Sequence, residues 1–297
     1  GEAHAEVHAL RAAAGKASGA TAYVTLEPCS HYGRTPPCAD ALIAAGVTRV
    51  VAAMQDPNPA VSGNGLARLR ASGVAVDCGL LASAAKELNI GFVSRMTRGR
   101  PWLRLKAAAS LDGKTALNNG LSQWITGPDA RRDGHAWRAR ACAILTGIGT
   151  VRDDNPQLNV RDVETPRQPL RVVVDSRLET PLDARILQGG TTLIVGAVEN
   201  VGRIEALRSV GAEVLILPNA SGKVDLAALL TALGGRGVNE VHAEAGFKLN
   251  GSLLREGLVD ELLLYLAPCL IGHEANGLFN LPELATLDGK RRLQIRD

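Results

Sequence analysis

Short apolar runs alternate with amphipathic stretches through the first hundred residues. Apolar and β-branched runs predict strands at 21–26, 47–54 and 74–78. Segments rich in Ala and Leu predict helices at 7–14, 39–45, 66–71 and 83–88. The run at 47–54 is almost wholly apolar, so we expect it to be buried on both faces. Strands that alternate with helices pair in parallel, which predicts an α/β domain.

A polar segment at 97–101, Thr-Arg-Gly-Arg-Pro, separates this pattern from a second alternation of strands and helices. We therefore place one domain over residues 1–98 and another over 99–297. Predicted strands in the second domain are 102–109, 142–146, 170–174, 192–195, 214–217, 240–243 and 261–266. Predicted helices are 129–140, 203–209, 225–233 and 249–255. The apolar run at 262–271 predicts a buried strand that continues into its connection.

The composition is that of a globular protein whose core is aliphatic. Hydrophobic residues make up 46% of the 297 positions but aromatic residues only 3%, so Leu, Val, Ile and Ala must fill the core. A formal net charge of +3 is too small to indicate nucleic-acid binding. The dense basic runs Arg131-Arg132 and Lys290-Arg291-Arg292 are typical of solvated surface. No apolar stretch is long enough for a membrane span.

The five cysteines are spread over a long chain. An odd, dispersed count argues against a disulfide framework and favours a reducing compartment, so we expect a cytoplasmic protein. Cys78, Cys142 and Cys269 lie in apolar runs, which predicts inert core positions.

His4, Cys29 and Cys38 form a candidate zinc site. Three protein ligands leave the fourth tetrahedral position open for water, which marks a catalytic site. Glu6 lies two residues after His4, and both can face one point only if His4 stands at the very start of a helix. Cys38 follows two prolines and opens the next helix, where a lowered thiol pKa would favour metal binding. His-x-Glu followed by Pro-Cys and a second Cys is the pattern of zinc-dependent base deaminases, in which the Glu moves protons.

Two alternatives to this zinc site remain open. Eight residues separate Cys29 from Cys38, whereas the common deaminase pattern has two, and both thiols could be ordinary buried side chains. His4 and His8 are spaced for one helix face, but a metalloprotease would need Glu where Ala5 stands.

Two stretches of the second half could carry chemistry. Glu244-Ala245-Gly246 before a predicted helix could bind an anion through backbone N–H groups, although a plain strand-to-helix connection has the same pattern. Trp124 lies between polar residues at 122–126, with Arg138 downstream. Its indole could stack on a ring, or it could be an ordinary partly buried side chain.

Taken together, the motifs resemble those of the bifunctional riboflavin-biosynthesis deaminase–reductases. In the first half the resemblance rests on His-Ala-Glu-Val at 4–7, the segments 25–31 and 33–38 around the cysteines, and Gln-Asp-Pro-Asn-Pro at 55–59. In the second half it rests on Ser-Leu-Asp-Gly at 110–113, Ser-Gln-Trp-Ile-Thr at 122–126, the segment 153–158 and Glu-Ala-Gly at 244–246. The eight-residue gap between the cysteines is that family's form. The family's usual opening strands are absent, so we expect missing upstream structure, and the last strand is expected to be cut short at Asp297.

The resemblance implies a cytidine-deaminase-like three-layer αβα domain followed by a dihydrofolate-reductase-like α/β domain. It further implies two reactions on a phosphorylated pyrimidine: zinc-dependent deamination, then NADPH-dependent reduction of the ribosyl group to ribityl. One Zn²⁺ per chain, NADPH, a homo-oligomer and no membrane or nucleic-acid partner belong to this expectation. One alternative is a lone reductase whose first domain is structural or inactive. Another is a nucleotide-binding regulatory module, which would not need Glu6 as a proton carrier.

The resemblance also implies site residues. Glu6 would be catalytic, and the metal ligands would be His4, Cys29 and Cys38. Substrate contacts would come from Ser122, Arg138, Leu158, Arg161 and Glu244. NADPH contacts would come from Ala108, Trp124, Thr150, Asp154, Ser176, Gly246, Phe247, Lys248, Leu249, Asn250, Gly251 and Ser252. Lys106 is a further candidate for the reductase pocket, while Thr150 could instead cap a helix and Ala108 and Leu158 could be ordinary packing.

Overall fold

The computed structural model describes residues 3–33 and 35–296 and divides the chain into two compact units, Gly1–Arg100 and Pro101–Asp297. The expected end of the last strand at Asp297 lies outside the described residues, as does Arg34 of the cysteine segment. The assignment of one functional domain to residues 1–98 and another to 99–297 stays a prediction. In the part that the structure describes, no helix is both long and apolar enough to cross a membrane.

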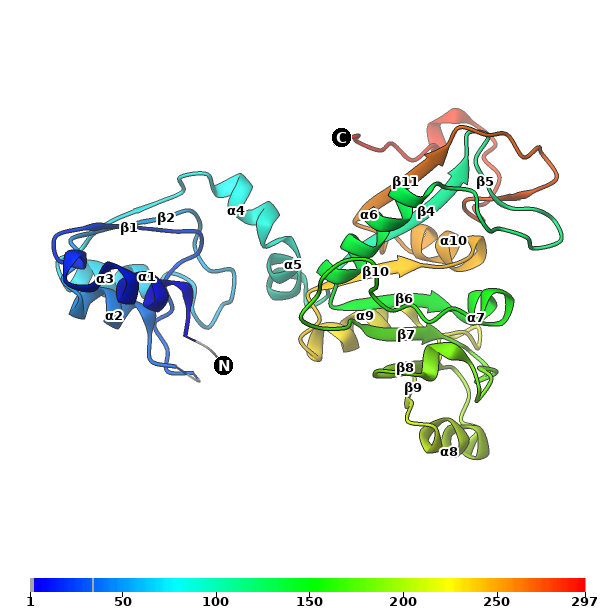
Figure 1. Cartoon of the computed structure of the whole chain (residues 1–297), viewed down its shortest axis with the longest axis horizontal. Coiled ribbons are helices and arrows are strands. Elements are labelled where there is room, and N and C mark those ends of the chain that lie inside the picture. The colour runs from blue at the N-terminus through cyan, green and yellow to red at the C-terminus, as the bar shows by residue number, and fades with distance from the viewer. Residues whose placement is uncertain (1–2, 34, 297) are drawn as a thin grey trace. The chain divides into compact units, whose positions relative to one another are not determined.

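Unit 1 is built on a parallel sheet of three strands with β2 in the centre. Its strands are β1 (Thr21–Val24), β2 (Arg49–Ala52) and β3 (Ala75–Cys78). Its helices are α1 (Ala5–Ala13), α2 (Cys38–Ala44), α3 (Asn64–Ala71), α4 (Ala82–Leu88) and α5 (Ile90–Arg98). Helices α1, α2 and α3 lie together on one side of the sheet (Figure 1), where Leu42, Val50 and Leu69 form the apolar core.

Unit 2 is built on a parallel sheet of seven strands in the order β11-β4-β10-β6-β7-β8-β9. The strands are β4 (Trp102–Ser110), β6 (Ala143–Gly147), β7 (Leu170–Val174), β8 (Thr192–Gly196), β9 (Glu213–Ile216), β10 (Glu240–Glu244) and β11 (Glu261–Ala267). The prediction of a strand at 170–174 is confirmed to the residue. A small antiparallel pair, β5 (Lys114–Ala116) and β12 (Asn276–Gly277), was not predicted.

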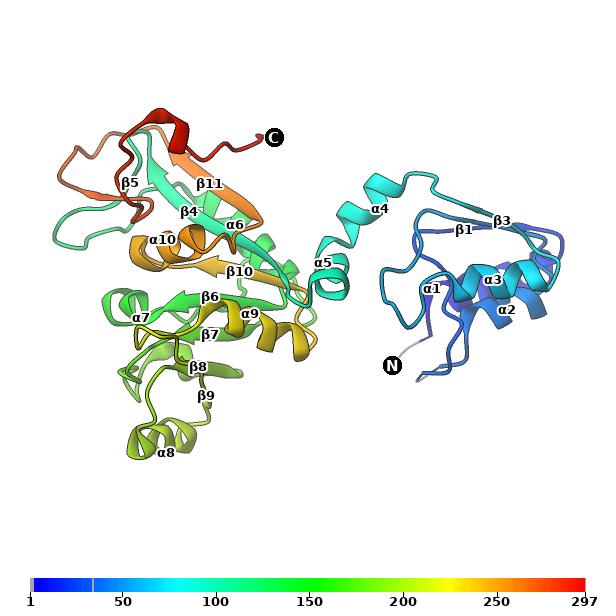
Figure 2. The same ribbon diagram turned by 180° about the vertical axis from the view of Figure 1, so that it is seen from behind.

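Helices cover both faces of this sheet. They are α6 (Pro128–Arg140), α7 (Ile148–Asp154), α8 (Val201–Ser209), α9 (Leu226–Gly235) and α10 (Phe247–Arg255). Side chains such as Leu145 and Leu193 pack with α9 and α10, whereas their neighbours Ile144 and Ile194 pack with α7 and α8. Figure 2 shows α9 and α10 on the near face. Because successive strand residues point to opposite faces and both are covered, the central strands read as continuous apolar runs.

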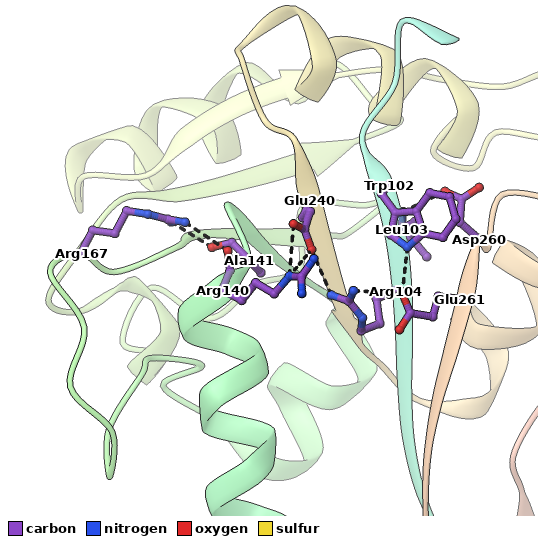
Figure 3. A network of polar contacts seen from close by, with 9 residues as sticks. All are labelled: Trp102, Leu103, Arg104, Arg140, Ala141, Arg167, Glu240, Asp260 and Glu261. Atoms are coloured by element: carbon purple, nitrogen blue, oxygen red, sulfur yellow. Dashed lines mark hydrogen bonds and ion pairs between the residues drawn. The ribbon is translucent and has the colours of Figure 1, made fainter. Parts of the chain in front are cut away.

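A buried ionic network ties the amino ends of β4, β10 and β11 together (Figure 3). Arg104 is only 2% exposed and pairs with Glu240 at 3.2 Å and Glu261 at 2.9 Å. Its guanidinium lies 4.1 Å from the centre of the Trp137 ring on α6. Trp102 donates its indole N–H to the same Glu261. The network fixes the relative positions of these three strands at their amino ends.

Two sequence predictions about burial were wrong. Cys78 and Cys269 are exposed and Cys142 is partly buried, so none of the three is a fully buried core residue. The strand predicted at 262–271 is the edge strand β11, which ends at Ala267 and exposes Leu264 and Leu266. It pairs with β4 on one side only, so an apolar sequence did not guarantee burial.

Candidate active sites

His4, Cys29 and Cys38 converge in unit 1, with their ligand atoms all within 4.8 Å of one another. The Nδ1 atom of His4 lies 3.6 Å from the Sγ of Cys29 and 3.3 Å from the Sγ of Cys38. Among the described residues, these three form a group of His, Cys, Asp or Glu side chains that could hold one metal ion. His8 is not part of it, so the spacing alternative of His4 with His8 finds no geometric support.

Helix ends position the three side chains. His4 is the N-cap of α1 and has an extended backbone, so it stands at the very start of the helix, as the sequence argument required. Cys38 is the first residue of α2, directly after Pro37. The backbone N–H of Cys38 donates to the Sγ of Cys29 at 3.2 Å, and the N–H of Ala39 donates to the carbonyl of Cys29 at 3.1 Å. The start of α2 therefore holds the cysteine loop in place.

Glu6 faces the same point. Burial first, then the charges of Glu6 and of the Cys29 thiol, raise the pKa of the Cys38 thiol. The sequence predicted that the helix N-terminus lowers this pKa. For the thiol without a metal ion this prediction was wrong, because burial and a neighbouring carboxylate outweigh the effect of the helix end. A divalent cation among the three ligands would reverse this balance. Two thiols and an imidazole are a donor set that suits zinc.

A cleft of about 1310 Å³ lies at the carboxyl ends of the strands of unit 2. Ala108 lies near the carboxyl end of β4, Gly147 ends β6, Ser176 follows β7 and Glu244 ends β10, and all four line the cleft. Ligands of open parallel sheets bind at this edge, where strand order reverses. Here β10 returns from the far side of the sheet to lie between β4 and β6.

A bidentate ion pair between Arg138 and Glu244 forms part of the cleft wall. Nε of Arg138 donates to Oε1 of Glu244, and Nη2 donates to Oε2 at 2.8 Å. Lys106 lies 4.0 Å and His242 3.4 Å from the same carboxylate. Burial alone would raise the pKa of Glu244, but Arg138, His242 and Lys106 hold it well below its usual range. Glu244 therefore stays ionised in the cleft and neutralises much of the charge of Arg138.

Trp124 stands at the cleft with 68% of its surface exposed, which contradicts the alternative of a partly buried side chain. The guanidinium of Arg131 lies 4.6 Å from its ring centre and donates to the carbonyl of Thr126 at 2.8 Å. Arg131 was predicted to be solvated surface but lines the cleft instead. The charge pattern could not show this, because adjacent positions of a helix face different ways and Arg132 is the exposed member.

His135 and Tyr265 line the cleft without any sequence signal. Burial, together with Arg138 and Arg161, lowers the pKa of His135 to about 4, so its ring is neutral near pH 7. Its Nδ1 accepts the backbone N–H of Arg161 at 3.3 Å. Tyr265 donates its hydroxyl to Asp133 at 2.5 Å, and burial first, then Asp133, raise the pKa of that hydroxyl. Both residues position neighbouring charged groups.

The N-terminal ends of α7 and α10 open onto the cleft, and they fit a phosphorylated cofactor. The N-cap of α10 is Gly246, which has no side chain to cap the first N–H groups, so these can accept an anion. Asn250 lines the cleft at 2% exposure, and among the described residues its Oδ1 has no hydrogen-bond partner. A Cβ on Gly246 would lie 3.9 Å from Oγ1 of Thr150, so the two helix ends meet. The N-cap of α7 is Gly147, so Thr150 is not its cap.

The structure places most of the sequence-predicted reductase residues on this cleft. Those that line it are Lys106, Ala108, Ser122, Trp124, Arg138, Thr150, Asp154, Leu158, Arg161, Ser176, Glu244, Gly246, Phe247, Lys248, Leu249 and Asn250. Gly251 and Ser252 do not line it. A Cβ on Gly251 would lie 2.2 Å from the carbonyl oxygen of Asn280, so this glycine serves close packing of α10 against another segment. Ser252 bonds to Lys248 and Arg255 along its own helix.

We expect Gly251→Ala to destabilise unit 2 by about 1–3 kcal/mol, because the added methyl group overpacks a contact with rigid backbone. The KM for NADPH should stay unchanged, since the residue does not reach the cleft. Thermal unfolding and NADPH kinetics check this, with Ser252→Ala as a matched control that should change neither. A raised KM at unchanged stability would return Gly251 to the cofactor site.

Family models match both units of the chain. The family model for the RibD C-terminal domain matches residues 101–296, and that for the cytidine and deoxycytidylate deaminase zinc-binding region matches residues 1–54. Riboflavin biosynthesis protein RibD of Escherichia coli is 51% identical over 100% of this chain and 83% of its own length. RibD of Bacillus amyloliquefaciens is 44% identical over 92% of this chain and 74% of its own.

Solved structures give the same result. RibD of Acinetobacter baumannii superposes with a TM-score of 0.91 at 43% identity, covering 100% of this chain and 82% of its own. A diaminohydroxyphosphoribosylaminopyrimidine deaminase/5-amino-6-(5-phosphoribosylamino)uracil reductase from Thermotoga maritima superposes with a TM-score of 0.86 at 31% identity, with the same coverage.

The first unit thus has the fold and ligand set of a zinc-dependent deaminase, and the second has the fold and cleft of a reductase. The chain belongs to the RibD family of riboflavin-biosynthesis proteins. It is a bifunctional enzyme that catalyses a deamination and a reduction, with Zn²⁺ and NADPH as cofactors.

Proposed function

We propose that His4, Cys29 and Cys38 hold one zinc ion per chain and that Glu6 is the proton carrier of the deaminase. The observation that carries this proposal is the convergence of three ligand atoms within 4.8 Å, with Glu6 two residues after His4 in the first turn of α1. When bound, zinc supplies a Lewis acid that makes water nucleophilic near neutral pH. Glu6, beside the ligands but not one of them, is placed to take a proton from that water and pass it to the ring and the leaving amine.

In the reductase cleft, the proposed substrate contacts are Ser122, Arg138, Leu158, Arg161 and Glu244. The proposed NADPH contacts are Ala108, Trp124, Thr150, Asp154, Ser176 and the segment from Gly246 to Asn250, while Gly251 and Ser252 support that segment from behind. NADPH supplies the hydride when bound. The residues of this chain orient the sugar carbon, exclude water and place charge where it is needed.

Arg138 and Arg161, the two cationic side chains among the proposed substrate contacts, differ in their partners. Arg138 is held by Glu244 and the carbonyl of Asn159, so it suits a neutral, hydrogen-bonding part of the substrate. Arg161 is exposed at the cleft, and its Nη1 contacts the neutral side chain of Asn159 at 3.1 Å. No carboxylate among the residues that the structure describes forms an ion pair with Arg161, and such a guanidinium suits a phosphate group better. We therefore assign the substrate phosphate to Arg161.

We propose that the substrate is a phosphoribosylaminopyrimidine, deaminated first and then reduced. The name of the Thermotoga maritima relative gives that protein a deaminase acting on a phosphoribosylaminopyrimidine and a reductase acting on a phosphoribosylaminouracil. Five free cysteines support a reducing compartment such as the cytoplasm. The exposed leucines of the edge strand β11 support a homo-oligomer. A net charge of +3 supports small-molecule rather than nucleic-acid partners.

Separate assays of ammonia release and NADPH oxidation on the purified chain test this function. We expect both activities, with reduction depending on the deaminated product. NADPH oxidation of supplied product without any ammonia release would favour the alternative of a lone reductase with an inactive first domain. Binding without turnover in either assay would favour a regulatory module.

A further inference from the structure

A buried carboxylate lies directly behind the cysteine loop of the deaminase. Glu27 is 3% exposed and precedes the metal ligand Cys29 by two residues. Its side chain does not join the metal-binding group, which among the described residues contains only His4, Cys29 and Cys38. A buried carboxylate needs hydrogen-bond donors to offset its loss of water, so its partners show what it does.

Within the described ranges, the Glu27 carboxylate accepts four hydrogen bonds, and all of them come from backbone N–H groups. Oε1 accepts from Gly65 at 2.8 Å and Leu66 at 3.3 Å, in the first turn of α3. Oε2 accepts from Asp56 at 3.1 Å and Gly63 at 2.9 Å. The carboxylate therefore caps α3 from a distant part of the chain and ties it to the turn at 55–59, whose sequence the metal and proton roles left unexplained.

A second contact joins the same two segments. A Cβ on Gly65 would lie 1.9 Å from the carbonyl oxygen of Pro28, the residue between Glu27 and Cys29. Only glycine allows the first turn of α3 to approach the loop this closely. The loop is thus held between the start of α2, which bonds Cys29, and the start of α3, which bonds Glu27.

The pattern of bonds requires a carboxylate. Each of the two oxygens accepts from two N–H groups, so neither can be replaced by a donor. The side-chain amide of glutamine would turn an NH₂ group towards one of these pairs and leave two buried N–H groups without an acceptor. Glutamine has nearly the same shape, so this substitution separates hydrogen bonding from packing.

We propose that Glu27 is a positioning residue of the deaminase, which anchors the Cys29 loop to α3 and so sets the geometry of the metal ligands. This inference rests on the proposed metal site. Groups behind a metal ligand are worth about 10- to 100-fold in metal affinity. Glu27 acts through the backbone of its own loop rather than through a bond to a ligand side chain.

The test is zinc release from the full chain into a chromophoric chelator. We expect Glu27→Gln to release zinc about 10- to 100-fold faster than wild type. Its deaminase activity should fall and recover when zinc is added in excess. NADPH-dependent reduction in unit 2 should stay at the wild-type rate, which reports that unit 2 is folded. The Co²⁺-substituted variant should also show altered d–d bands, because those bands report ligand geometry.

Two further variants make the result specific. Arg49→Ala breaks an exposed ion pair with Asp77 in the same unit and should release zinc at the wild-type rate. Cys29→Ser removes a proposed ligand and should abolish stable zinc binding. If Cys29→Ser keeps its zinc, the proposed metal site fails. If it loses zinc but Glu27→Gln retains zinc as wild type does, only the role of Glu27 fails.

A folding defect does not leave the question open. Should proteolysis show that unit 1 of Glu27→Gln is unfolded even in excess zinc, Gly65→Ala decides. It keeps the carboxylate but pushes on the carbonyl of Pro28, so faster zinc release is expected. Wild-type release from Gly65→Ala would overturn the anchoring on which the proposal stands.

Discussion

Glu6→Gln should abolish ammonia release while the chain keeps its zinc. Glutamine fills the same space but cannot accept and return a proton, and a positioned general acid–base is worth about 10²- to 10⁴-fold in rate. The three ligands His4, Cys29 and Cys38 are unchanged, so the metal should stay. The loss should appear in kcat rather than in KM, because the proton moves only in the chemical step.

Steady-state ammonia release and zinc content, measured on the same sample, check this prediction. His8→Gln is a matched control, since His8 lies on the same helix, is exposed and takes no part in the metal group. Reduction by unit 2 should be unaffected in both variants. A Glu6→Gln enzyme that deaminates at the wild-type rate would remove the proposed mechanism.

Glu244→Gln should both disable the reductase and destabilise unit 2. The substitution leaves the largely buried guanidinium of Arg138 without its bidentate partner. Breaking a buried ion pair from one side costs about 3–5 kcal/mol, because the remaining charge is uncompensated. Reduction should fall as well, since Arg138 and Lys106 both lose the carboxylate that orients them in the cleft.

Chemical denaturation and NADPH oxidation measure these effects, with deamination as the internal reference. Glu179→Gln is a matched control, because Glu179 lies at the same cleft but forms exposed ion pairs with Arg152 and Arg177, which are worth at most about 1 kcal/mol. Equal losses of unfolding free energy and of NADPH oxidation in the two variants would show that the Arg138–Glu244 pair has no special role.

The stability difference between wild type and Glu244→Gln should depend on pH in one direction. The pKa of Glu244 is lower in the folded chain than the ordinary value of 4.5. A lowered carboxyl pKa stabilises the fold above the pKa of the unfolded chain, and this contribution is lost as pH falls towards the folded value. The difference should therefore be constant near neutral pH and shrink below about pH 4.5. A stability difference that grows on acidification would contradict a lowered pKa of Glu244 in the folded chain.

Much of the fold follows from local patterns. The central strands of unit 2 are buried on both faces, so their apolar runs identify them almost to the residue, as at 170–174. The metal group was also readable, because a helix start, two prolines and a fixed order of His, Glu and Cys constrain where the side chains can go. These signals depend on neighbours in sequence.

The rest depends on contacts between distant segments, which no local pattern records. Glu27 and α3, or Arg138 and Glu244, are brought together only by the folded sheet. Gly251 was expected among the NADPH contacts, yet its missing side chain makes room for Asn280 rather than for a ligand. The exposed edge of β11 could not be foreseen either, because strand order decides which strand has no second neighbour.

The zinc content per chain of the purified protein, measured beside Cys38→Ser, tests the central claim most directly. The metal site predicts one zinc per wild-type chain and less than stoichiometric zinc in the variant, with ammonia release falling in parallel and reduction unchanged. A wild-type chain that releases ammonia without zinc, or a Cys38→Ser chain that keeps its full zinc content, would contradict it.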